Sequence, residues 1–222
     1  MQESEENSTV TQVKMDCDYK KNAGYFIFKR IIDFIGALVG LILISPVMII
    51  VAIWIKLDSK GPVFFAQSRV GRDGKQFVMY KFRSMCTDAE ELLGELKDDN
   101  EMSGPMFKIK DDPRITKIGK FVRKTSIDEL PQLFNIIKGD MSLVGPRPSL
   151  PKEVAQFTTF QKQRLIAKPG LTCYWQVSGR SDVSFKEWMK MDVKYIIKRN
   201  TLLDIILIVK TVGVLFGDKG AM

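Results

Sequence analysis

The longest apolar run of the chain extends from Phe34 to Ile55, and Ser45 is its only clearly polar side chain. A helix that spans a bilayer needs about 20 residues, so the run is long enough. Pro46 lies in its middle, lacks an N–H for the carbonyl of Ile42 and forces a bend. Each arm would be about 16 Å long, roughly half the thickness of the hydrocarbon layer.

Basic residues flank this run on both sides. Lys29 and Arg30 precede it, and four more follow: Lys56, Lys60, Arg69 and Arg72. Because cytoplasmic flanks of membrane segments are rich in Lys and Arg, both ends are expected in the cytoplasm. We therefore predict a re-entrant helix-break-helix over residues 25–58 that turns at Ser45-Pro46, with the Ser45 hydroxyl bonded to the carbonyl of Leu41. A kinked spanning helix with a short external tail is the alternative.

The remaining pattern predicts a flexible tail at 1–24 and a cytoplasmic domain at 59–222. The tail is polar and lacks the layout of a signal peptide. Residues 63–70 and 76–85 flank an Asp73-Gly74 turn signal, which indicates a β-hairpin.

Helices are predicted for the rest of this domain. The apolar positions Leu130, Leu133, Phe134 and Ile137 indicate an amphipathic helix that ends at Gly139. Further helices are expected at 87–97, 151–166, 185–199 and 201–217, and a mobile loop at 98–106. The last helix would lie against the membrane surface or complete the core. The predicted fold class is thus α+β and helix-rich, with a re-entrant membrane hairpin, a short β-hairpin and amphipathic interfacial helices.

Composition narrows the chemistry. The net charge of +8 and the pI near 9.3 point to nucleic acid, acidic lipid or phosphorylated small molecules as partners. The chain has no histidine, and its three cysteines are too widely spaced for a zinc site or a disulfide framework. Acid-base or nucleophilic chemistry must therefore use carboxylates, Lys, Tyr, Ser or Cys, and a reducing cytosol is the default compartment.

Asp128 and Glu129 are the first candidates for that chemistry. Ser126 and Glu129 also have the spacing of a capping box, in which both side chains would bond free backbone groups at a helix start. Pro131 weakens this reading because a helix starting at Ser126 would place it beyond the tolerant first turn. On spacing alone, the structural role is favoured.

Basic residues near this pair suggest a phosphate site instead. Arg147 lies between two prolines, and a rigid guanidinium suits bidentate phosphate binding. Arg180 follows Gly179 in a loop, where it is a further phosphate or sugar contact or simply a solvated arginine in a glycine turn. Four more cations lead up to the acidic pair: Lys117, Lys120, Arg123 and Lys124.

Taken in order, several strings resemble the monotopic phosphoglycosyl transferases, the bacterial sugar transferase family that initiates glycan assembly on polyprenyl phosphate. The resemblance covers roughly residues 25–217 and includes the Ser45-Pro46 segment. Its strings are KRIIDF, YKFRSM, DDPRITKIGKFVRKTSIDELPQLFN, KGDMSLVGPRP and KPGLTCYWQVSGR. The chain resembles the minimal form of the family, since larger relatives carry extra membrane helices and a further domain before this region.

The resemblance implies transfer of a sugar 1-phosphate from a UDP-sugar to polyprenyl (undecaprenyl) phosphate, with release of UMP, at the start of exopolysaccharide, capsule, O-antigen or glycoprotein glycan assembly. It implies that Asp128 is the nucleophile that forms a covalent phosphosugar intermediate and that Glu129 is a ligand of Mg²⁺. Four residues match the family's basic positions and are assigned to substrate phosphates: Lys81, Arg123, Arg147 and Arg180. Cys173-Tyr174 departs from the Gly-Trp pair of many relatives, which leaves the sugar preference open.

The resemblance also implies a monotopic protein of the bacterial inner membrane, with its catalytic domain on the cytoplasmic face and membrane lipid as a partner. The rival hypothesis is a non-catalytic membrane-surface protein that binds anionic lipid. A nucleic-acid partner is not expected, because no recognition motif appears. These motifs leave the oligomeric state unknown.

Overall fold

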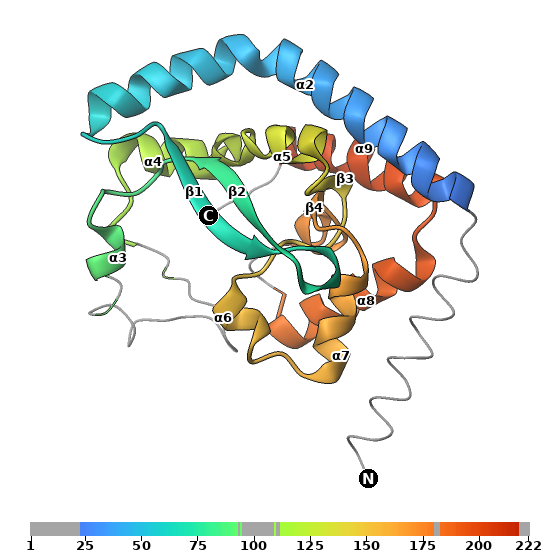
Figure 1. Cartoon of the computed structure of the whole chain (residues 1–222). Coiled ribbons are helices and arrows are strands. Elements are labelled where there is room, and N and C mark those ends of the chain that lie inside the picture. The colour runs from blue at the N-terminus through green and yellow to red at the C-terminus, as the bar shows by residue number, and fades with distance from the viewer. Residues whose placement is uncertain (1–22, 93, 95–108, 110–111, 180–182, 218–222) are drawn as a thin grey trace.

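The computed structural model describes residues 23–92, 94, 109, 112–179 and 183–217. Residues 1–22 of the tail predicted at 1–24, the loop predicted at 98–106 and Arg180 lie outside the described residues, and residues 23–24 belong to the first helix. Figure 1 shows one long helix that arches over the other elements, with the β-hairpin and shorter helices beneath it.

That long helix is α2, which extends from Ala23 to Asp58 over 36 residues. The chain stays helical through Pro46, so the predicted break is not observed and a curved, continuous helix takes its place. The Ser45 hydroxyl donates to the carbonyl of Ile42 at 2.8 Å, and the predicted acceptor Leu41 is therefore wrong. Ile42 is the residue whose carbonyl loses its helical partner when position 46 is proline, so Ser45 supplies the missing donor.

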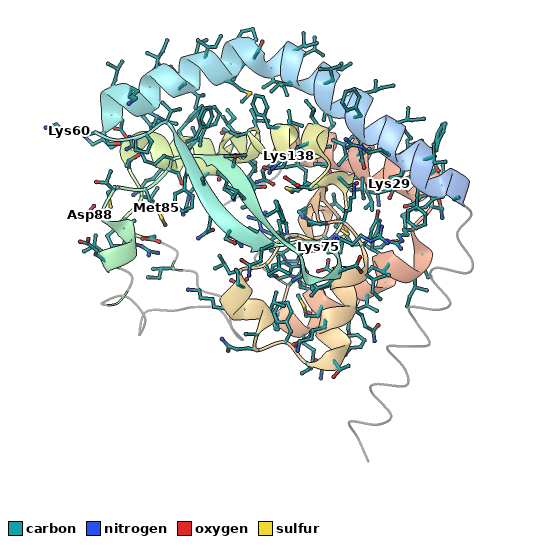
Figure 2. The ribbon with its side chains drawn as sticks, viewed as in Figure 1. Lys29, Lys60, Lys75, Met85, Asp88 and Lys138 are labelled. Carbon is teal, nitrogen blue, oxygen red and sulfur yellow. The ribbon has the colours of Figure 1, made fainter. Side chains whose placement is uncertain are left out.

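Both ends of α2 are bonded to the domain below. Near the N-terminal end, Lys29 forms an ion pair with Asp204 at 3.0 Å, and Figure 2 shows Lys29 beneath α2 on the side of α9. Arg30 donates to two carbonyls of α5 at 2.6 and 2.7 Å. At the other end, Arg83 donates to the carbonyl of Ser59 at 2.8 Å. These bonds fix the helix to one face of the domain at both ends.

The predicted β-hairpin is confirmed. Strand β1 (Phe64–Val70) pairs antiparallel with β2 (Gln76–Phe82), in a register that joins Val70 to Gln76. The connection contains the turn η1 (Arg72–Gly74), where Asp73 and Gly74 adopt positive φ angles of 55° and 78°. Asp and Gly tolerate this region, which explains why the turn signal located the hairpin.

Three elements between the hairpin and the second sheet border the acidic pair: α4 (Lys117–Lys124), the short turn η3 (Ile127–Glu129) and α5 (Gln132–Lys138). Gly139 ends α5 with a φ of 97°, as predicted. Before α4 lies α3 (Ala89–Leu92), which covers part of the helix predicted at 87–97.

The C-terminal third contains a parallel pair that the sequence did not predict: β3 (Ser142–Val144) and β4 (Gly170–Thr172). The helix predicted at 151–166 is three short elements: α6 (Pro151–Val154), α7 (Thr159–Lys162) and η4 (Gln163–Ile166). Thr158 accepts a bond from the backbone N–H of Gln161 and starts α7 anew, which interrupts the predicted helix. The last elements are η5 (Trp175–Val177), α8 (Phe185–Lys198) and α9 (Thr201–Gly217).

Apolar side chains of α2 divide between the core and the surface. Ala37, Val51 and Ile55 are buried against the hairpin, α4 and α5. The outward side chains are exposed, for example Leu43 at 72% and Leu57 at 79%. Among the described helices, α2 alone is long and apolar enough to cross a membrane, with a mean hydropathy of 2.8 over its most apolar window.

Helix α9 shares this division. Leu207 is buried in the core cluster around β3 and α8, whereas Leu202 and Val209 are exposed. One face of α9 therefore completes the core, and its other face adds to the apolar surface that begins on α2.

Candidate active site

The acidic pair lies on η3, not in a capped helix. Ser126 adopts a left-handed conformation with a φ of 56° and makes no cap bond through its side chain. The capping-box role that spacing alone favours is therefore wrong. A positive φ is uncommon for serine and is often found at functional sites. The turn directs Glu129 toward β2, and the helix proper begins only after Pro131.

Two cations converge on one oxygen of Glu129. Lys81 of β2 lies 2.7 Å from its Oε1 atom, and Arg147 of the loop after β3 lies 2.7 Å from the same atom. Lys81 also lies 3.8 Å from Oδ2 of Asp128. The side chains are mostly enclosed, with exposures of 11% for Asp128 and 30% for Arg147. Residues from three separate parts of the chain thus form one charged cluster, which we call the carboxylate cluster: Lys81, Asp128, Glu129 and Arg147.

Arg123 belongs to the same neighbourhood. Its Nε atom donates to the hydroxyl of Ser84 at 2.9 Å, and its positive charge lowers the pKa of Asp128. Arg123 lies on α4, and burial lowers the pKa of its guanidinium, which borders the cluster beside Asp128. Of the four basic residues predicted to bind substrate phosphates, the structure brings Lys81 and Arg147 onto the acidic pair and Arg123 beside it.

The two carboxyl groups have opposite pKa shifts. Burial raises the pKa of Asp128 above its ordinary value, and the charge of Glu129 raises it further, against the lowering effect of Lys81. Burial also opposes ionisation of Glu129, but Arg147 and Lys81 outweigh it and hold the pKa of Glu129 well below its ordinary range. Neighbouring acids whose environments separate their pKa values commonly have different roles in catalysis.

The backbone that carries Arg147 is tightly constrained. Gly145, directly after β3, and Gly170, at the start of β4, lie so close together that a Cβ on either would overlap the backbone of the other segment. Pro146 and Pro148 then fix the φ angles on both sides of Arg147. Its guanidinium lies 5.9 Å from the ring centroid of Trp175, within reach of a cation–π contact.

Several residues that support this site carry no clear signal in the sequence. Arg69 donates to the carbonyl of Pro148 at 3.1 Å, and its pKa is lowered to about 10 by burial and by the charge of Arg147. Asn135 of α5 bonds the backbone of β2 next to Lys81. Arg164 binds the carbonyl of Arg147 at 2.6 Å. Each is remote in sequence from the residue that it supports, so no local pattern could reveal the contact.

The donor set fits Mg²⁺ in one particular way. Mg²⁺ prefers oxygen ligands and usually takes one or two carboxylates, with substrate phosphates and water completing its shell. Asp128 and Glu129 offer two adjacent carboxylates, and the low pKa of Glu129 keeps that group ionised. Within the described part of the chain, no group of three or more His, Cys, Asp or Glu residues is suited to a metal. These two carboxylates fit Mg²⁺ if substrate and water supply the remaining ligands.

The chain is similar in sequence to several curated proteins whose names describe sugar transfer or exopolysaccharide production. The chain is 50% identical over 198 residues to the "Galactosyl transferase CpsE" of Streptococcus agalactiae, covering 89% of this chain and 44% of that protein. It is 44% identical to the "Undecaprenyl-phosphate galactose phosphotransferase" of Salmonella typhimurium, covering 87% and 41%. It therefore spans less than half the length of these two relatives. The "Exopolysaccharide production protein ExoY" of Sinorhizobium fredii is 36% identical, with 88% of both chains covered.

The model of the family described as "Bacterial sugar transferase" matches residues 24–218. This range begins at the start of α2, includes every residue of the carboxylate cluster and extends just beyond α9. The chain therefore belongs to the bacterial sugar transferase family.

Proposed function

We propose that this chain transfers a sugar 1-phosphate from a UDP-sugar to polyprenyl phosphate and releases UMP, at the carboxylate cluster. The observation that carries the proposal is the enclosed acidic pair, in which Glu129 is bound by two cations and Asp128 is left as the more basic carboxyl. Membership of the family, and the names of the curated relatives, support the substrate class. The names of two relatives include galactose, which makes UDP-galactose the first donor to test.

The chemistry follows from the positions of the charges. An ionised carboxylate is a nucleophile without help from a base, which suits a chain without histidine. In the first step, an oxygen of Asp128 bonds to the β-phosphorus of the donor, the bond from that phosphorus to the bridging oxygen breaks, and UMP leaves with the electron pair. In the second step, an oxygen of polyprenyl phosphate bonds to the same phosphorus and Asp128 leaves as a carboxylate. The products are UMP and a polyprenyl diphosphate sugar.

The main electrostatic obstacle to this reaction is repulsion between the carboxylate of Asp128 and the diphosphate of the donor. Nearby cations reduce this repulsion. Lys81 and Arg147 lie within the cluster and Arg123 borders it, so all three are placed to neutralise the charge that develops on the phosphates. Arg180 is proposed for the same role from the family resemblance. Glu129 would hold Mg²⁺, and when bound the ion would supply further neutralisation of negative charge at the phosphates.

We also propose that α2 is re-entrant, so that the domain lies on the cytoplasmic face of the bacterial inner membrane. Both ends of α2 are bonded to one face of the same domain, through Lys29 and Arg30 at one end and by Arg83 at the other. A spanning helix would place its ends on opposite sides of the bilayer, and breaking these charged contacts would leave polar groups without partners. The division into a tail at 1–24, a membrane segment at 25–58 and a catalytic domain at 59–222 remains part of this proposal.

The proposal is tested by incubating the purified protein with Mg²⁺, undecaprenyl phosphate and a panel of UDP-sugars, and measuring UMP. Asp128→Asn should abolish UMP release and leave membrane association unchanged. Asp140→Asn is a matched control, because Asp140 lies outside the carboxylate cluster and forms an ion pair with the exposed Lys138. If Asp128→Asn retained activity, or if no donor gave UMP with folded protein, a non-catalytic protein that binds anionic lipid would be the better account.

A further inference from the structure

A second charged pair is connected to the carboxylate cluster through the backbone of Arg147. Arg164 of η4 and Asp192 of α8 form an ion pair at 2.7 Å, with side-chain exposures of 1% and 0%. The Arg164 guanidinium also donates to the carbonyl of Arg147 and to the hydroxyl of Ser149, both at 2.6 Å. One buried guanidinium thus joins α8 to both sides of Pro148.

We propose that Arg164 and Asp192 are a positioning pair, which sets the place of the Arg147 guanidinium in the carboxylate cluster. The inference rests on the function proposed above, because it assigns the pair a part in that reaction. Neither residue reaches the acidic pair directly, so both act through the backbone of Arg147.

The contacts around Arg147 leave little freedom to its loop. The carbonyl of Arg147 is bound by Arg164, that of Pro148 by Arg69, and that of Ser149 by the backbone N–H of Val70 at 2.9 Å. Three consecutive carbonyl groups are therefore fixed by partners from two sites in the chain, η4 and the end of β1. The backbone that carries the Arg147 side chain is therefore held in place on both sides of Pro148.

Aromatic rings link the two arginines by a second route. The Arg147 guanidinium faces Trp175, the Trp175 and Trp188 rings stack with centroids 4.3 Å apart, and Arg164 lies 5.3 Å from the Trp188 centroid. Backbone and rings together form a closed path from Arg164 to Arg147. Displacing Arg164 would therefore disturb Arg147 from two directions.

Stability alone does not explain this pair. Buried ion pairs often contribute less than apolar side chains of similar volume, because both charges lose their hydration. Burial raises the pKa of Asp192 to about 6 despite the adjacent Arg164, which indicates that its charged form is poorly solvated there. A pair that is costly to bury, yet bound to the loop of Arg147, is better explained by the geometry that it imposes.

The test is a double-mutant cycle on UMP release. Arg164→Met with Asp192→Leu removes both charges at once, so the core remains packed and no charge is left unpaired. We expect unfolding close to that of the wild-type protein, but kcat/KM lower by at least about tenfold, since small displacements of a catalytic group are costly. In an Arg147→Met background, the same two substitutions should have almost no further effect.

One control and one further variant separate positioning from general destabilisation. Thr158→Ala removes the cap of α7, which lowers stability in the same region without touching the Arg147 loop, and should leave kcat/KM unchanged. Ser149→Ala keeps the ion pair and deletes one contact to the loop, so it should lower kcat/KM by a few fold. It serves as the test if the double substitution fails to fold.

The proposal is overturned if the charge-free pair keeps wild-type kcat/KM, or if it lowers kcat/KM equally in the Arg147→Met background. The same cycle is measured for binding of UMP by calorimetry. If the wild-type protein released no UMP from any donor, the proposed function would fail, while the calorimetric cycle would still decide whether Arg164 acts through Arg147.

Discussion

Asn135 connects the fold to the site, and its removal gives the most quantitative prediction. Its side chain is fully buried, donates to the carbonyl of Val78 at 2.7 Å and accepts from the N–H of Tyr80 at 3.1 Å. The amide thus pairs with the outer edge of β2 as a further strand would, immediately before Lys81. Asn135→Ala removes both hydrogen bonds, so α5 no longer fixes the position of β2 next to Lys81.

The expected loss of stability follows from the two hydrogen bonds and from the burial of the amide. Two hydrogen bonds at about 1 kcal/mol each give about 2 kcal/mol, and a fully buried unsatisfied carbonyl or N–H would add about 1–3 kcal/mol each. The amide that covers these two groups is fully buried, so about 2 kcal/mol is the lower figure. We therefore expect Asn135→Ala to lower the free energy of unfolding by at least about 2 kcal/mol and to reduce UMP release, because Lys81 loses its fixed position.

Denaturant unfolding in detergent measures the first effect, and the UMP assay at a temperature where the variant is folded measures the second. Gln156→Ala is the matched control, since it deletes an exposed amide bonded only to the carbonyl of Lys152 and should change neither quantity appreciably. Wild-type stability and activity in Asn135→Ala would refute the reasoning that this amide holds β2 and Lys81 in place.

Three further predictions concern charge and topology. Lys81→Met should move the acid limb of the pH–activity profile to higher pH, because Lys81 lowers the pKa of Asp128, and an unchanged limb would contradict the assignment of Asp128 as the group that must be ionised. Glu129→Gln should move that limb to lower pH, because the charge of Glu129 raises the same pKa; pH–rate profiles of both variants, corrected for folded fraction, are the measurement. Pro46→Ala should restore the helical bond to Ile42 and straighten α2, which labelling of cysteines placed before α2 would report as a larger fraction of chains exposed outside the membrane. Labelling from the cytoplasmic side alone, as proposed for the wild type, would show that the bend does not set the topology.

The elements that the sequence predicted well are those encoded by local patterns. The Asp73-Gly74 turn, the apolar spacing before Gly139 and the long apolar run located the hairpin, α5 and α2. The break at Pro46 was wrong because Ser45 supplies the bond that proline cannot make. The helix predicted at 151–166 was wrong because Thr158 starts a new helix within it.

The site was less accessible, since its geometry depends on long-range pairing. The sequence nominated Lys81, Glu129 and Arg147, but only the folded chain shows both cations on one carboxylate oxygen. The β3–β4 pair that carries Arg147 has three residues in each strand, too few for a periodic signal. Arg164 and Asp192 have the sequence pattern of ordinary polar residues in helices, and no pattern near either residue indicates that the two side chains meet in the core.

The central claim is that Asp128 becomes transiently bonded to the phosphorus of the donor. The most direct measurement is to incubate the protein with a UDP-sugar labelled at the β-phosphate, in the absence of polyprenyl phosphate, and to quench the reaction. The labelled residue is then located by mass spectrometry. The account predicts a sugar phosphate on the peptide that contains Asp128, its loss when polyprenyl phosphate is added, and no label in Asp128→Asn. UMP release without any covalent label, or label on another residue, would contradict it.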